Sequence, residues 1–153
     1  LIAMAVGVLY ARSAANEDIF ESDLPWHTTL ATAQEAAQTD GKPILVDVYA
    51  TWCGPCQMLE TDTFAHETVQ QRLVADFVLL KVDVDQQPEL AARYSDGAVP
   101  TLTVARPDGT PVHQYIGFIP PASFLAFLED GRRAAAQTPS NAPTKASAYS
   151  SGK

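Results

Sequence analysis

The chain has 153 residues, of which 46% are hydrophobic and 18% are charged, so it is long enough for one domain with a single hydrophobic core. Eighteen acidic and ten basic residues give a net charge of −8, which argues against a nucleic-acid partner because such partners select clustered Lys and Arg.

The N-terminus begins with an apolar run at residues 1–11, followed by Arg12 and the small residues Ser13 and Ala15. The run is shorter than the ~20 residues that span a bilayer, and the pattern is typical of a signal peptide or the end of a membrane anchor. We expect residues 1–15 to be such a remnant and the acidic residues 16–25 to be a linker. The segment predicts a periplasmic protein, exported or anchored to the inner membrane, where cysteine pairs are common. A buried N-terminal strand or helix is the alternative.

The first expected helix begins after Thr28 or Thr29, either of which can cap it. It runs to about Thr39, and Asp40-Gly41 ends it. We expect Trp26 to pack this helix onto the rest of the domain.

An almost continuous apolar stretch at residues 43–49 predicts a strand with both faces covered, as in a parallel sheet. Asp47 interrupts this stretch. A charged, unpaired carboxylate there is costly, so burial should raise the pKa of Asp47 and keep it protonated near neutral pH. A partly wetted carboxylate at the strand end is the alternative.

The strand runs into Trp52-Cys53-Gly54-Pro55-Cys56, which holds the two cysteines of the chain. A Cys-x-x-Cys pair between a strand and a helix is the sequence form of a dithiol redox site. Helix-opening amides favour the thiolate of Cys53, and Pro55 suits the first helical turn. Gly54 leaves the surface beside the sulfur uncrowded. We predict a redox-active disulfide that needs no cofactor.

A zinc site and a purely structural disulfide are the alternatives to redox chemistry at the cysteine pair. A zinc site needs two more ligands, and the histidines are scattered at His27, His66 and His113. A structural disulfide closing so small a loop would add little stability. We therefore predict redox chemistry and no bound metal.

The remaining elements alternate between helix and strand. The helix after Cys56 should continue to about Thr63, and a further helix at residues 66–74 should bury Val69, Leu73 and Val74. The later expected elements are a strand at 77–84, a helix at 88–94, a hairpin of strands 101–105 and 112–116 with its turn at 107–109, and a last helix from Pro120 or Pro121. Residues 137–153 lack periodicity and should be a disordered tail.

The pentapeptide at residues 52–56 is similar to the active-site signature of thioredoxins. Other stretches extend the resemblance: Gly41-Lys42-Pro43, Lys81-Val82-Asp83-Val84-Asp85, Val99-Pro100-Thr101 and Gly117-Phe118. Glu60, Thr63 and Phe64 resemble more specifically the C-terminal domain of the transmembrane thiol:disulfide interchange reductase DsbD and small periplasmic relatives. The resemblance covers about residues 24–130. It implies an α/β thioredoxin fold at residues 26–136, with a central mixed sheet flanked by helices on both faces.

The resemblance also implies roles for three charged residues. Asp47 matches the buried acid that exchanges a proton with Cys56. Lys81 matches a lysine near that acid, and a snorkelling surface lysine is the alternative. Glu60 matches a second acid near the cysteines, which makes it a further candidate catalytic residue, and a solvated helix face is the alternative. Two acids near a sulfur disfavour the thiolate, so we expect the pKa of Cys53 to lie above that of thioredoxins. Thr61 departs from cytosolic thioredoxins, which usually have a helix-kinking proline there.

The same resemblance implies a substrate-binding surface. The peptide bond before Pro100 should be cis and lie against the cysteines, leaving the Val99 backbone free to pair with an extended substrate. Trp52, Gly54 and Pro55 should complete this surface.

The sequence therefore predicts an enzyme that reduces protein disulfides by dithiol exchange through Cys53 and Cys56. We expect its substrates to be disulfide-bearing proteins and its electron donor to be a membrane or dithiol partner. We expect the protein itself to be a monomer. One alternative is the terminal electron-relay domain of a larger transmembrane reductase, with residues 1–10 ending its last membrane helix. Another is a module that binds a metal or an assembly partner.

Overall fold

The computed structural model describes residues 23–137. The expected signal or anchor at residues 1–15, most of the expected linker and the expected tail beyond residue 137 lie outside the described residues. Within the described part of the chain, no helix combines the length and the apolar character that crossing a membrane requires.

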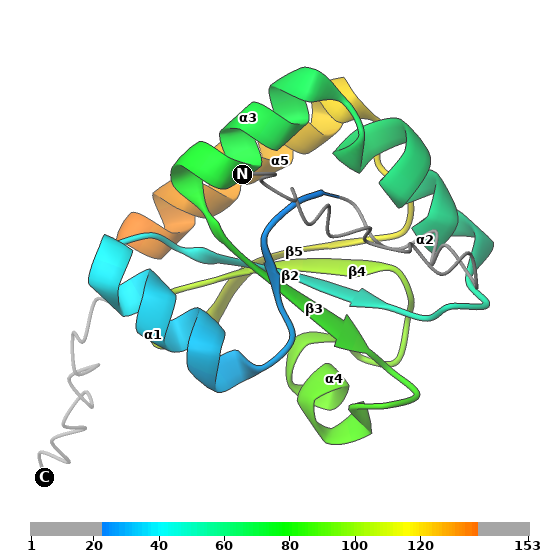
Figure 1. The fold of residues 1–153 in the computed structure, drawn as a ribbon, viewed down its shortest axis with the longest axis horizontal. Helices are drawn as coiled ribbons and strands as arrows, with labels where there is room; N and C mark the ends of the chain where they lie inside the picture. Colours follow the sequence, from blue (N-terminus) through cyan, green and yellow to red (C-terminus); the bar gives the residue numbers. More distant parts are fainter. Residues whose placement is uncertain (1–22, 138–153) are drawn as a thin grey trace, which may run out of the picture.

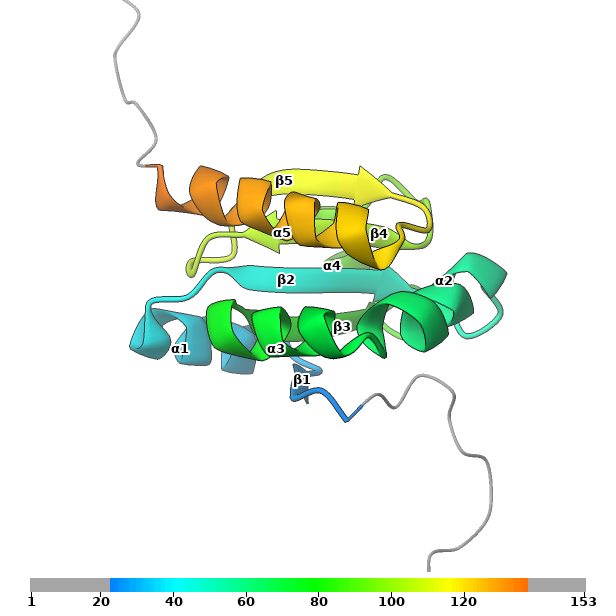
Figure 2. The same cartoon turned by 90° about the horizontal axis from the view of Figure 1, so that it is seen from above.

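A five-stranded mixed sheet in the order β1-β3-β2-β4-β5 forms the centre of the fold (Figure 2). Its strands are β1 (Trp26–His27), β2 (Ile44–Tyr49), β3 (Val78–Asp83), β4 (Thr101–Ala105) and β5 (Pro111–Ile116). Strands β1 and β2 run parallel to β3, and β4 runs antiparallel to both β2 and β5. The predicted α/β thioredoxin fold with a mixed sheet is confirmed.

Helices cover both faces of the sheet (Figure 1). On one face, α1 (Leu30–Asp40) and α4 (Pro88–Tyr94) pack against the alternate side chains of β2 and β3. On the other, η1 (Leu59–Phe64), α3 (Glu67–Asp76) and α5 (Pro121–Ala136) enclose a larger core. Helix α2 (Gly54–Met58) follows β2 and leads directly into η1.

Local signals placed several boundaries correctly. Thr29 caps α1 by accepting a hydrogen bond from the Thr32 amide, and Gly41 ends the helix with φ 66°, a conformation that glycine adopts without steric cost. The hairpin turn has Gly109 at φ 84°, as the turn sequence indicates.

Several details differ from the sequence-based expectation. Trp26 forms a two-residue strand. Its ring packs against Phe64 at 5.5 Å between centroids, in the core on the opposite face of the sheet from α1. Val74 is 50% exposed, because the inward stripe of α3 consists of Val69 and Leu73.

The helix after Cys56 does not continue as a regular α-helix. It ends at Met58 and becomes the π-helix η1, a rare element that is frequent at functional sites. Glu60, Thr63 and Phe64 are buried there. The Thr63 hydroxyl donates a hydrogen bond to the Ile119 carbonyl at 2.6 Å, which fixes η1 to the segment before α5.

Candidate active site

Cys53 and Cys56 form a disulfide at the point where β2 gives way to α2. Cys53 has extended backbone angles and caps α2, and its Sγ accepts a hydrogen bond from the Cys56 amide at 3.2 Å. Pro55 lies in the first turn of the helix, where its missing N–H leaves no partner unsatisfied. The predicted order of strand, cysteine pair and helix is therefore present.

Both cysteines are buried in this disulfide form. They form a small cluster with Ala50. Three partly buried side chains pack against this cluster: Tyr49, Val84 and Val99. Cys53 is 4% and Cys56 3% exposed, so exposure does not distinguish the attacking sulfur from the resolving one. The hydrogen bond that the Cys53 sulfur accepts does distinguish the two positions.

The surface beside the disulfide is formed by exposed residues. Gly54 and Pro55 are exposed, and Trp52 is 68% exposed. The Trp52 indole N–H donates to Asp85 Oδ2 at 2.9 Å, and the Asp85 amide donates to Asp83 Oδ1 at 2.9 Å. The sequence predicted no role in the site for either aspartate. The Trp52–Asp85 hydrogen bond joins residues that are 33 positions apart in the sequence, so no local pattern indicates it.

The Val99–Pro100 peptide bond is cis, as the resemblance implied. Pro100 is buried, Val99 packs against the cysteine cluster, and the Gly117 amide donates to the Pro100 carbonyl at 2.9 Å. The structure thus brings this predicted stretch next to the cysteines.

Three predicted charged residues meet on one face of the sheet. Asp47 on β2 is aligned with Lys81 on β3, and the Lys81 ammonium donates to Glu60 Oε1 on η1. All three are buried. The alternatives of a wetted Asp47, a solvated Glu60 and a snorkelling Lys81 are therefore wrong.

Burial raises the pKa of Asp47 to about 7, since removal from water disfavours the carboxylate. The Lys81 ammonium lowers this pKa and the Glu60 carboxylate raises it, both to a smaller extent than burial does. Among the described residues, no group donates a hydrogen bond to Asp47 Oδ1. Asp47 can therefore hold or release a proton near neutral pH.

The surroundings of Lys81 were not predicted. Its Nζ lies 5.2 Å from the centroid of the Trp26 ring and 5.1 Å from that of Tyr49. Strand β1 is too short to show periodicity, so no local signal pointed to Trp26.

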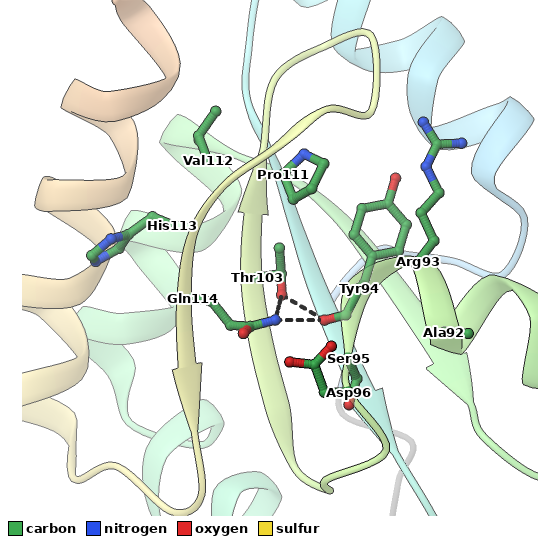
Figure 3. A pocket seen from close by; sticks show the side chains of 10 residues that line it. All are labelled: Ala92, Arg93, Tyr94, Ser95, Asp96, Thr103, Pro111, Val112, His113 and Gln114. Atoms are coloured by element: carbon green, nitrogen blue, oxygen red, sulfur yellow. Dashed lines mark hydrogen bonds between the residues drawn. The ribbon is translucent and has the colours of Figure 1, made fainter.

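A separate hollow of about 300 Å³ lies between the end of α4 and strands β4 and β5 (Figure 3). Gln114, one of the lining residues, donates to the Tyr94 carbonyl at 2.8 Å and to Thr103 Oγ1 at 3.2 Å. No residue predicted for the active site lines it. Nowhere in residues 23–137 do three or more His, Cys, Asp or Glu side chains gather as a metal site would require.

Comparison with known proteins places this geometry in a family. Residues 25–116 match the thioredoxin-like family. The chain is 40% identical over 89 residues to a thioredoxin of Staphylococcus aureus, covering 56% of this chain and 78% of that protein.

Solved structures agree with this match. A thioredoxin from Thermus thermophilus superposes with a TM-score of 0.63 at 30% identity, covering 71% of this chain and 87% of that one. The oxidised DsbD C-terminal domain of Neisseria meningitidis gives a TM-score of 0.58 at 27% identity, covering 67% and 91%. With its fold, its cis proline and its Cys53–Cys56 disulfide as the redox group, the chain belongs to the thioredoxin-like family.

Proposed function

We propose that the protein reduces disulfide bonds of other proteins by dithiol exchange through Cys53 and Cys56. The observation that carries this proposal is the Cys53–Cys56 disulfide at the start of α2, next to the cis Val99–Pro100 bond. The strand that leads into it holds the buried Asp47.

The reaction begins from the reduced pair. The Cys53 thiolate attacks one sulfur of a substrate disulfide, that disulfide breaks, and a mixed disulfide forms while the first substrate thiolate leaves. The Cys56 thiolate then attacks Cys53 Sγ, releases the second substrate thiolate and leaves the Cys53–Cys56 disulfide. Two electrons pass to the substrate, and a membrane or dithiol donor restores the pair.

Asp47 is the proposed proton acceptor for Cys56. Its pKa near 7 suits this task, because a general base works best when its pKa is close to the operating pH. Glu60 and Lys81 modulate Asp47 through their charges, and Trp52, Gly54, Pro55, Val99 and Pro100 form the surface that a substrate segment contacts.

The reducing direction rests on Gly54-Pro55, the pair found in low-potential thioredoxins. Equilibration with glutathione at a series of ratios measures the potential. A value as oxidising as that of DsbA would overturn the reducing assignment while leaving dithiol exchange in place.

Trapping is the direct test of the exchange reaction. The Cys56→Ser variant should accumulate mixed disulfides through Cys53, whereas Cys53→Ser, the matched control, should accumulate none. The wild-type chain should also accelerate insulin reduction by dithiothreitol. Absence of both results would overturn the proposal.

We place this activity in the periplasm on the sequence pattern of residues 1–15, and we propose separately that the protein is a monomer. Fractionation of cells that express the full-length protein tests the compartment, and sedimentation tests the oligomeric state. Recovery of the protein in the cytoplasmic fraction would overturn the assigned compartment.

An electron-relay domain of a larger transmembrane reductase is the second candidate. The similarity to the DsbD C-terminal domain covers 91% of that chain, and the buried Glu60 beside Asp47 fits the resemblance. The upstream sequence of the gene decides between the two candidates. Several apolar spans there would favour the relay domain, whereas a short signal or anchor would favour the free protein. Activity that survives Cys53→Ser would instead favour a metal- or partner-binding module.

A further inference from the structure

The Lys81 ammonium is held by groups from three other elements. Glu60 of η1 accepts its hydrogen bond, and the rings of Trp26 in β1 and Tyr49 in β2 lie 5.2 Å and 5.1 Å from its Nζ. The Lys81 side chain is only 8% exposed. Lysine is almost never buried to this extent without partners that compensate its charge, so these contacts explain how the ammonium stays inside.

We propose that Trp26 is a positioning residue: together with Tyr49 it holds the Lys81 ammonium beside Glu60 and Asp47, and so sets how firmly Asp47 retains its proton. This role deepens the proposed function, because it matters to the reaction only if Asp47 accepts the proton of Cys56.

The register of the strands supports this arrangement. Asp47 is aligned with Lys81, and Trp26 is aligned with Leu79, two residues before Lys81. Because side chains two residues apart share a face of a sheet, Trp26, Lys81 and Asp47 lie on the same face. Strand β1 is the outer strand beside β3 (Figure 2), so Trp26 belongs to the strand at this edge of the sheet, with its ring 5.2 Å from the Lys81 Nζ.

The charges on this face define what the position of Lys81 controls. The titratable groups on this face include Asp47 and Tyr49 of β2, Lys81 and Asp83 of β3, and Glu60 of η1. Strand β5 adds His113 and Tyr115, whose rings pack on Phe127 of α5, while β4 contributes apolar side chains such as Leu102. The cysteines are joined in the disulfide and do not titrate. Lys81 favours the Asp47 carboxylate and Glu60 opposes it.

Loss of the indole ring has a definite electrostatic consequence. The attraction between an ammonium and an aromatic face is strongest where water is excluded, and an aliphatic side chain does not provide it. Without the ring, the ammonium can move past β1 towards solvent and away from Asp47. The neutral form of Asp47 is then favoured, and the proton is retained to higher pH.

The test is a carbon-13 NMR titration of the Asp47 side-chain carboxyl in the oxidised full-length protein. Lys81→Met should raise the midpoint by about 1 to 3 pH units, the range typical for a neighbouring charge. Trp26→Met should raise it by a smaller amount, and Trp26→Phe should leave it near the wild-type value. In the Lys81→Met background, Trp26→Met should add little, because both changes act through one ammonium.

Phe124→Leu is the matched control. It removes a buried ring from the same core, and this ring packs on Phe64 with 5.6 Å between the two centroids. It should lower stability and leave the midpoint unchanged. A wild-type midpoint in Trp26→Met, or a shift that adds in full to that of Lys81→Met, would overturn the inference. Trp26→Leu is made in parallel with Trp26→Met, and the midpoint measured in whichever of the two variants folds decides the test. The titration uses the oxidised protein and no substrate, so its result is independent of the insulin and trapping assays.

Discussion

Asp47 links the chemistry of the site to the stability of the fold. The apolar strand around it excludes water, and this burial raises its pKa from 3.8 to about 7. A group whose pKa is raised on folding binds a proton in the native state that the unfolded chain has already released. The same burial that suits Asp47 to the proposed proton transfer therefore weakens the native state wherever the carboxylate is charged.

Stability should consequently fall as the pH rises from about 4 to about 8. The native state keeps the Asp47 proton between the unfolded pKa near 4 and the folded pKa near 7, and the cost above both values is roughly 4 kcal/mol. Asp47→Asn cannot titrate, so it should flatten this profile and exceed the wild type in stability at pH 8. Urea unfolding of the oxidised protein at pH 5 and pH 8 measures both effects. The exposed Asp62→Asn should keep the wild-type slope, and an unchanged slope in Asp47→Asn would contradict the assignment.

At the scale of elements, the site depends on how the π-helix η1 is held against the core. Glu60 reaches Lys81 from η1, so the placement of this helix decides which charges approach Asp47. Thr63 provides one fixed point, because its hydroxyl bonds the Ile119 carbonyl across 56 residues of sequence in a buried position.

Thr63→Val should lower the free energy of unfolding by about 1–3 kcal/mol, because it leaves a buried carbonyl without its donor. Thr61→Val is the control in the same helix. The Thr61 hydroxyl is exposed and bonds the Gln57 carbonyl, so its loss should cost less than about 0.5 kcal/mol. Urea unfolding at one pH compares the two variants. Equal losses would show that the Thr63 bond has no special part in fixing η1.

Helix α5 also approaches the sheet closely, at Gly131. A Cβ added there would lie 2.5 Å from Cγ2 and 2.9 Å from Cβ of Val104 on β4. Val104 is fully buried and β-branched, so it has little freedom to move aside.

Gly131→Ala should therefore destabilise the protein by about 1–3 kcal/mol, the usual cost of overpacking, despite the higher helix propensity of alanine. Val104→Ala on its own leaves a cavity and should also destabilise. The double variant should be more stable than the sum of the two losses predicts, because the new methyl group occupies the vacated space. Thermal and urea unfolding of the three variants measure this, and simple additivity would contradict the close contact.

Across the whole molecule, the sequence predicted features that depend on neighbouring residues. Thr29 and Gly41 mark the ends of α1 by their own capping preferences, and the cysteine spacing with the apolar strand before it located the disulfide. Asp47 stood out because a carboxyl group interrupts an apolar run. In each case a few adjacent residues held the information.

The features that escaped prediction depend on distant partners. Trp26 forms a strand only because it pairs with Leu79 of β3, and two residues carry no readable period. The π-helical path of η1 and the enclosure of Lys81 by Trp26 and Tyr49 arise where separate elements meet. The family resemblance supplied the residues of the site, whereas their contacts required the fold.

The distribution of the core leads to the last prediction, that residues 23–137 fold on their own. Every buried apolar side chain of the described core lies between Leu24 and Leu128, and each strand has its partners within this range. We expect a fragment of residues 23–137 to unfold cooperatively, with a Tm within about 5 °C of the full chain, since the fragment keeps every core residue that the structure describes. It should also retain the insulin-reduction rate. Calorimetry and the insulin assay on both proteins provide the comparison. A fragment that unfolds without a cooperative transition would show that segments outside residues 23–137 contribute to the core.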